Sequence, residues 1–109
     1  MQNCWLILGE LYYHYEATDF LEPVTEDLIG PEMYEDYCKV ISEPMDIGTV
    51  IQKMKSGAYH NSKDLFRQDI ELIFTNCRLF NEEDTEIVNC AKTLSKKFKE
   101  LWINYRMYG

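Results

Sequence analysis

The segment from Asn61 to Asn81 constrains the fold most, because it carries apolar residues on two faces of one predicted helix. One stripe recurs at steps of four, three, four and three, and a second recurs at steps of seven. A helix with two such stripes must be covered from several sides, so we expect it at the centre of the molecule. The stripes are Phe66, Ile70, Ile73, Cys77 and Phe80, and Leu65, Leu72 and Leu79.

Three further segments show the same helical periodicity. The first spans about residues 3–17. The second starts at the N-cap residue Asp46 and stops at Ser56 and Gly57. The last follows Asp84 or Thr85 and runs to about Tyr105. For the central helix, Asn61 or Ser62 is the expected cap. We therefore predict an all-α antiparallel four-helix bundle with a long first connecting loop.

The first connection, from Thr18 to about Met45, is too long and too apolar to be a solvated spacer. Prolines and a glycine interrupt it, and residues 34–41 have room for one or two helical turns. Ordered connections of this length are usually functional. In an up-and-down bundle the first and third connections share an end, so this loop should lie beside Asn81 and the residues after it.

Asn81 directly follows the apolar end of the central helix. Its uncharged amide offers two donors and one acceptor, which suits a neutral polar ligand held in a pocket with apolar walls. The alternative is that Asn81 only ends the helix, since asparagine tolerates the left-handed C-terminal position. The sequence of this stretch leaves both interpretations open.

Composition narrows the classes of function. The 109 residues suffice for one domain, and a net charge of -8 disfavours direct nucleic-acid binding while favouring a basic partner. No apolar run approaches the roughly 18 residues that span a bilayer, so no membrane partner is expected. Because the first three residues lack the basic start of a signal peptide, we expect a piece of a longer protein.

The reactive side chains do not form a recognisable catalytic or metal-binding motif. The four cysteines are widely spaced and lack matching histidines, so we expect no zinc site, no other metal and no cofactor. Because the number of cysteines is even, disulfide bonds between them are possible. Their apolar surroundings in the sequence favour free thiols in a reducing compartment. Phosphate loops, nucleophile elbows and His-Glu-x-x-His are absent, so we expect no catalytic residues and no enzyme.

Four separated blocks resemble the bromodomain family in order and spacing. They are FLEPV at 20–24, YCKVISEPMD at 37–46, NCRLFN at 76–81 and DTEI at 84–87. The resemblance implies a left-handed four-helix bundle, with residues 1–109 forming a single bromodomain from a larger chromatin-associated protein. It also implies a monomeric nuclear module that binds acetylated lysine on histone tails or other basic peptides.

The resemblance implies a role for each site residue. Asn81 would donate to the acetyl carbonyl, and Tyr37 would hold a water that bridges to the same oxygen. The remaining members are wall, gate and entrance residues. They are Val24, Phe20 and Phe80 beside the loop, Ile87 at the gate opposite them, and Tyr34 over the entrance.

The chain departs from the family pattern at two places. Thr18 and Asp19 stand where many members carry Trp-Pro, and Cys38 replaces a common second tyrosine. The loop is also longer near residues 30–32. The missing tryptophan motivates a second hypothesis, an interaction module of bromodomain type without acetyl-lysine selectivity. A third is a helical signalling bundle or small enzyme on the same scaffold.

Overall fold

The computed structural model describes residues 1–107, and every regular element in that range is helical. The helices of the bundle are α1, α4, α5 and α6, and the first connection contains the short 3-10 helix η1 and the helices α2 and α3. Their bounds are α1 Gln2–Tyr12, η1 Thr18–Phe20, α2 Glu26–Ile29, α3 Pro31–Val40, α4 Ile47–Ser56, α5 Lys63–Phe80 and α6 Glu86–Asn104. The prediction of an all-helical bundle is confirmed.

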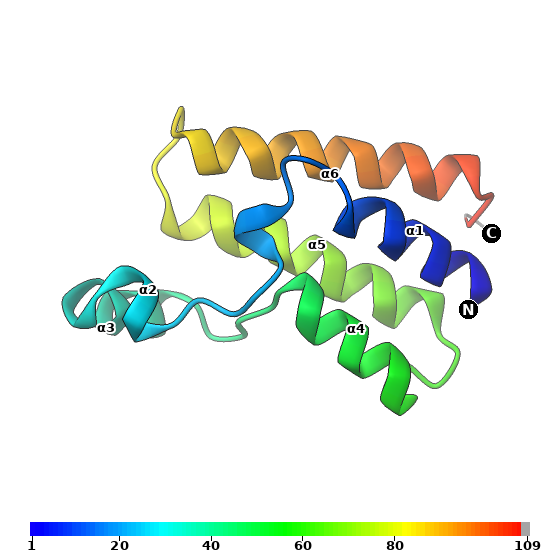
Figure 1. Ribbon diagram of the computed structural model, residues 1–109, viewed down its shortest axis with the longest axis horizontal. Coiled ribbons are helices and arrows are strands. Elements are labelled where there is room, and N and C mark those ends of the chain that lie inside the picture. Colours follow the sequence, from blue (N-terminus) through cyan, green and yellow to red (C-terminus); the bar gives the residue numbers. More distant parts are fainter. Residues whose placement is uncertain (108–109) are drawn as a thin grey trace.

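Successive helices of the bundle run in opposite directions (Figure 1). α5 packs against α4 and α6, while α1 packs against α4 and α6. The first connection and the α5–α6 connection lie at one end of the bundle, and both termini lie at the other. This is the shared end that the up-and-down topology predicts.

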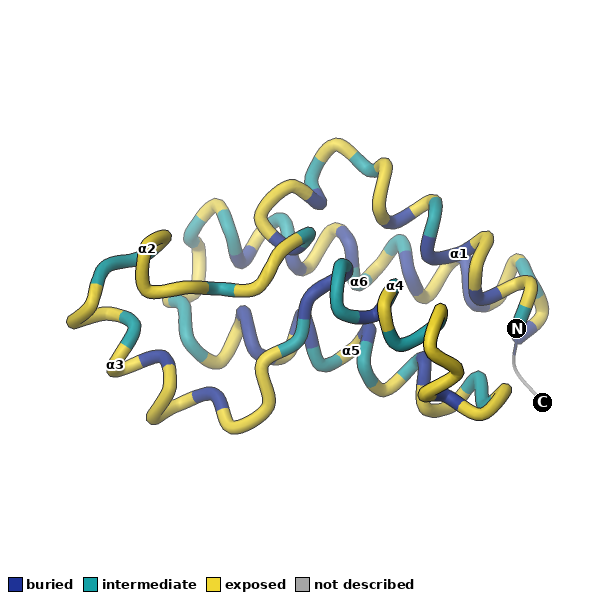
Figure 2. The backbone as a smooth tube through the Cα atoms, turned by 60° about the horizontal axis from the view of Figure 1, so that its bottom comes forward, coloured by how far each residue is buried: buried dark blue, intermediate teal, exposed yellow. Residues whose placement is uncertain are grey.

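The core follows the predicted apolar faces. Buried positions recur along α1, α5 and α6, whereas the α2–α3 region is mostly exposed (Figure 2). Burial of this apolar surface is the main favourable contribution to folding. The largest completely buried side chains include Ile7, Leu8, Leu11, Val50, Phe66, Ile70, Leu94 and Phe98.

The second stripe predicted for α5 is not a buried face. Leu79 is 62% exposed and Leu65 is also exposed, whereas Phe74 and Asn76 are buried instead. The neighbours of α5 are α3, α4 and α6, and the face of residues 65, 72 and 79 is not fully covered by them. The spacing of seven residues correctly places Leu65, Leu72 and Leu79 on one face of the helix. The prediction that this face is buried is wrong.

α1 ends at Tyr12, earlier than the predicted end near residue 17, and Tyr15, which lies beyond the helix, is exposed. A local turn replaces the last helical turn. The Nδ1 atom of His14 accepts a hydrogen bond from the backbone N–H of Glu16 at 3.1 Å, and the His14 carbonyl accepts from Ala17. This turn brings Ala17 into the core.

The first connection contains more helix than predicted. α3 spans ten residues, because Gly30 adopts a φ of 88° and Pro31 then occupies the first helical position. Proline is favoured there, since its missing N–H would have no partner within the helix. Gly30 and Pro31 therefore start a helix, although glycine and proline are residues typical of loops.

The predicted caps are confirmed at three helix ends. The Asp46 carboxylate accepts from the N–H of Thr49 at 2.9 Å and from its hydroxyl at 2.6 Å. Gly57 ends α4 in the left-handed conformation, and Ser62 caps α5 by accepting from Leu65. α6 begins after Thr85 and ends one residue before the predicted Tyr105.

The start of the first connection is fixed against α4. The N–H of Gly48 donates to the carbonyl of Leu21 at 2.9 Å, and the buried ring of Phe20 meets Phe74 edge to face. A Cβ atom on Gly48 would lie only 2.7 Å from that carbonyl oxygen. The absence of a side chain at Gly48 therefore permits the loop to approach the helix this closely.

We predict that Gly48→Ala lowers the free energy of unfolding by about 1–2 kcal/mol, measured by urea denaturation. Overpacking of this kind typically costs about 1–3 kcal/mol, which the better helix propensity of alanine offsets in part. Gly9→Ala is the matched control, because a Cβ there meets no atom within 4 Å. It should raise stability by about 0.5–1 kcal/mol. Equal effects at both positions would contradict the close approach at Gly48.

Candidate functional site

A cavity of about 480 Å³ opens where the first connection meets the end of α5 and the start of α6. Its lining is predominantly apolar, with a few convergent polar groups, as is usual for small-ligand sites. Six of the seven predicted site residues line it, namely Phe20, Val24, Tyr37, Phe80, Asn81 and Ile87. Tyr34 does not, since its ring lies against that of Tyr37 with centroids 6.3 Å apart.

Asn81 is oriented by the last turn of α5. Its backbone N–H and its side-chain Nδ2 both donate to the carbonyl of Cys77, each at 3.0 Å. The backbone of Asn81 is extended, with φ of -100°, so the alternative that it adopts the left-handed conformation is wrong. Its Nδ2 atom also donates to the Cys77 thiol at 3.7 Å, whereas the side-chain carbonyl oxygen of Asn81 bonds to no group among residues 1–107.

Tyr37 places a polar atom on the wall of the cavity. The residue is only 8% exposed, and the ring of Phe80 meets its ring edge to face at 5.1 Å. Its hydroxyl has no hydrogen-bond partner within the described part of the chain. Burial, followed by the nearby Cys38 and Tyr34 groups, raises the pKa of Tyr37, so its hydroxyl stays protonated at neutral pH.

Cys77 joins the two sides of the site. Its thiol is buried, donates to the carbonyl of Ile87 at 3.6 Å and accepts from the Asn81 amide at 3.7 Å. Burial is the main cause that raises the pKa of this thiol, which keeps it in the unreactive protonated form. All four cysteines of the chain are free, so the open question of disulfides is answered in favour of thiols.

Sequence reasoning missed other residues of the lining. Asn76 is buried and donates from Nδ2 to the carbonyl of Glu43 at 2.7 Å, which ties the end of the first connection to α5. Leu28 and Met33 give the cavity an apolar rim on α2 and α3, although both are exposed. The apolar content of the loop was visible in the sequence, but the residues that face the cavity could not be identified without the bounds of α3.

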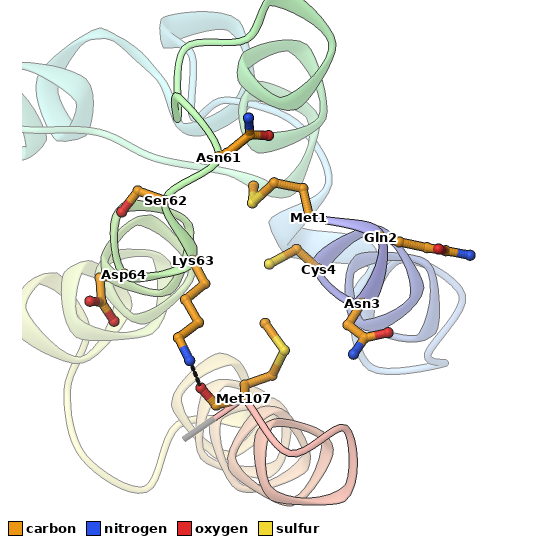
Figure 3. A pocket seen from close by; sticks show the side chains of 9 residues that line it. All are labelled: Met1, Gln2, Asn3, Cys4, Asn61, Ser62, Lys63, Asp64 and Met107. Atoms are coloured by element: carbon orange, nitrogen blue, oxygen red, sulfur yellow. Dashed lines mark hydrogen bonds between the residues drawn. The ribbon is translucent and has the colours of Figure 1, made fainter. Parts of the chain in front are cut away.

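A second hollow lies at the other end of the bundle, where both termini lie (Figure 3). It has a volume of about 630 Å³ but is open to solvent. Polar atoms form a larger share of its lining than they do in the first cavity. Lys63 reaches across it to the Met107 carbonyl. None of the predicted site residues lies there, so the smaller cavity is the candidate site.

Within residues 1–107, no group of three or more His, Cys, Asp or Glu side chains is placed to hold a metal ion. In the same range, no helix combines the length and hydrophobicity needed to cross a bilayer.

Comparison with known proteins gives one consistent result. The family model described as Bromodomain matches residues 4–93. Relatives include the bromodomain adjacent to zinc finger domain protein 2 of Caenorhabditis elegans, 40% identical over 91% of this chain, and protein 2B of the same name from Homo sapiens, 38% identical over 91%. Transcription factor GTE1 of Arabidopsis thaliana is 38% identical over 94% of the chain.

The chain spans only a small part of these relatives. It covers 7% of the Caenorhabditis elegans protein, 4% of the human protein and 26% of the Arabidopsis thaliana protein. The family match over residues 4–93 includes all the residues that line the cavity. The match over most of the chain confirms the resemblance noted from four short blocks, and the chain therefore belongs to the bromodomain family, whose members generally act as acetyl-lysine reader modules.

Proposed function

We propose that this domain binds acetylated lysine in histone tails or similar basic peptides, and that the cavity beside Asn81 holds the acetylated side chain. The orientation of Asn81 carries the proposal. Its Nδ2 atom donates to the Cys77 carbonyl at 3.0 Å and to the Cys77 thiol at 3.7 Å, and the weaker bond to sulfur would give way to a bond with the acetyl carbonyl when the ligand enters. The hydroxyl of Tyr37 is the second polar group, and it would hold a water that bridges to the same oxygen.

The apolar lining has a complementary role. Val24 and Phe20 would form the loop wall, and Ile87 would stand opposite them against the lysine methylenes. Phe80 fixes the ring of Tyr37 from one side. Tyr34 stacks on the same ring, so its contribution would pass through Tyr37 and not through contact at the base of the cavity.

Selection of the acetylated form follows from the cost of burying charge. A lysine ammonium that enters an apolar cavity loses hydration worth several kcal/mol, and the Asn81 amide would present a donor to it. An acetamide is neutral and accepts that hydrogen bond for a net gain of about 1 kcal/mol. Since few atoms enter the cavity, we expect dissociation constants between roughly micromolar and millimolar.

The wider context is part of the same proposal. We infer a single non-catalytic domain, residues 1–109, that acts as a monomer within a larger nuclear, chromatin-associated protein. The relatives are much longer than this chain, which supports the inference that the domain is part of a larger protein. The net charge of -8 supports a basic peptide as partner in preference to nucleic acid.

Asn81→Ala should abolish binding to acetylated histone-tail peptides in calorimetric titrations, because the alanine cannot donate to the acetyl carbonyl. Its free energy of unfolding should change by less than about 1 kcal/mol, since the backbone bond to Cys77 remains. Asn89→Ala is the control, because this exposed asparagine on α6 does not line the cavity. Unchanged affinity in Asn81→Ala would refute the proposal.

The same titrations distinguish the second hypothesis, an interaction module without acetyl-lysine selectivity. Unmodified and acetylated peptides of the same sequence would then bind the wild-type protein equally. We expect the unmodified peptide to bind at least about tenfold more weakly, which is about 1.4 kcal/mol.

Two tyrosines should separate binding from stability. Tyr37→Phe should weaken binding of acetylated peptide about fivefold, because a hydrogen bond contributes about 1 kcal/mol net, while stability changes by less than about 0.5 kcal/mol. Tyr59→Phe should do the reverse. The Tyr59 hydroxyl donates to Asp69 at 2.6 Å away from the cavity, and its removal should cost about 1–3 kcal/mol of stability without affecting affinity. Urea denaturation and calorimetry measure the two effects.

A further inference from the structure

We propose that the ion pair between Glu83 and Lys92 positions two sides of the acetyl-lysine cavity, so that its loss weakens binding although neither residue touches the ligand. This inference rests on the proposed function and adds two positioning residues to it. The Nζ atom of Lys92 lies 2.7 Å from the Oε1 atom of Glu83. Neither residue lines the cavity, whereas Asn81 and Ile87, on either side of the α5–α6 connection, do.

The α5–α6 connection joins the polar donor of the site to its gate. α5 ends at Phe80 and α6 begins at Glu86. The separation between Asn81 and Ile87, which lies in the first turn of α6, therefore depends on the conformation of residues 82–85. None of these four residues lines the cavity. Their influence on a ligand passes through the positions of Asn81 and Ile87.

The backbone of this connection is not a relaxed turn. Asp84 has a φ of 66°, in the left-handed region that is disfavoured for a residue with a side chain. Such a conformation persists where surrounding contacts hold it. One of these contacts is local, since the Thr85 hydroxyl donates to the Glu82 carbonyl at 2.8 Å. The ion pair with Lys92 instead ties the middle of the connection to the second turn of α6.

The strength of the ion pair sets the size of the expected effect. The hydrogen bond from Lys92, followed by its positive charge, lowers the pKa of the Glu83 carboxyl group, so this group is ionised at neutral pH. The side chains of Glu83 and Lys92 are 57% and 42% exposed, so their interaction is modest and is screened by salt. Its loss lowers the fraction of molecules with a binding-competent connection, and the apparent affinity falls with that fraction.

The test measures binding of a neutral ligand, an acetylated lysine with uncharged blocked termini, in NMR titrations. Because this ligand has no charge, direct attraction to acidic side chains does not contribute to its affinity. Glu83→Gln and Lys92→Met should each raise the dissociation constant about two- to fivefold at low ionic strength. The double variant should bind no more weakly than the weaker single variant, because all three variants lose the same ion pair.

Salt concentration provides a readout that a purely structural role of the two side chains would not change. In the wild-type protein, the affinity for the neutral ligand should fall toward that of the variants as salt screens the ion pair. The affinities of Glu83→Gln, Lys92→Met and the double variant should not depend on salt, since the pair is already absent.

Asp64→Asn is the matched control. It removes the ion pair of Asp64 with Arg67, whose side chains are 62% and 41% exposed, and Asp64 lies at the opposite end of the bundle. This variant should bind the neutral ligand as the wild type does.

Equal affinities of the wild type and both single variants, or additive losses in the double variant, would overturn the positioning role. In that case the wild-type protein would still bind acetylated lysine, and the proposed function would stand. A wild-type protein that does not bind the neutral acetylated ligand would overturn both proposals.

Discussion

Two hydrogen bonds between the first connection and the bundle support the rest of this structure. At the start of the connection, the Leu21 carbonyl accepts from Gly48 on α4. At its end, the Glu43 carbonyl accepts from the buried side chain of Asn76 on α5. Neither carbonyl has a partner within a regular helix, and the two bonds supply one for each. These bonds offset part of the conformational entropy that is lost when the long segment is ordered as a wall of the cavity.

The polar groups of the cavity fall into two classes. Asp46 and Asn76 hold the fold, the first as a helix cap and the second through its bond to the Glu43 carbonyl. Asn81 and Tyr37 keep hydrogen-bonding capacity after their own positions are fixed. Both residues line the apolar cavity, and a few polar groups on apolar walls are typical of a small-ligand site.

The sequence predicted the bundle well because its signals are local. Asp46, Gly57 and Ser62 mark helix ends through their own side chain or backbone preferences, and the spacing of apolar residues in α6 has one simple interpretation. The predictions were wrong at positions where tertiary contacts decide whether a side chain is buried. Leu65 and Leu79 share a face that the neighbouring helices do not fully cover, and Tyr15 lies in a turn stabilised by His14. The site residues came from a family resemblance, while their shared cavity was expected from topology alone. The hydrogen bonds that orient Asn81 against Cys77 could be seen only in the structure.

The exposed rim of the cavity affects the thermodynamics of binding. Leu28 is 71% exposed and Met33 is 52% exposed, although both face the cavity opening. A peptide that covers them removes apolar surface from water, which gives a negative change in heat capacity. The binding enthalpy then becomes more favourable with rising temperature. The contribution of these two side chains therefore depends on temperature differently from that of the polar groups deeper in the cavity.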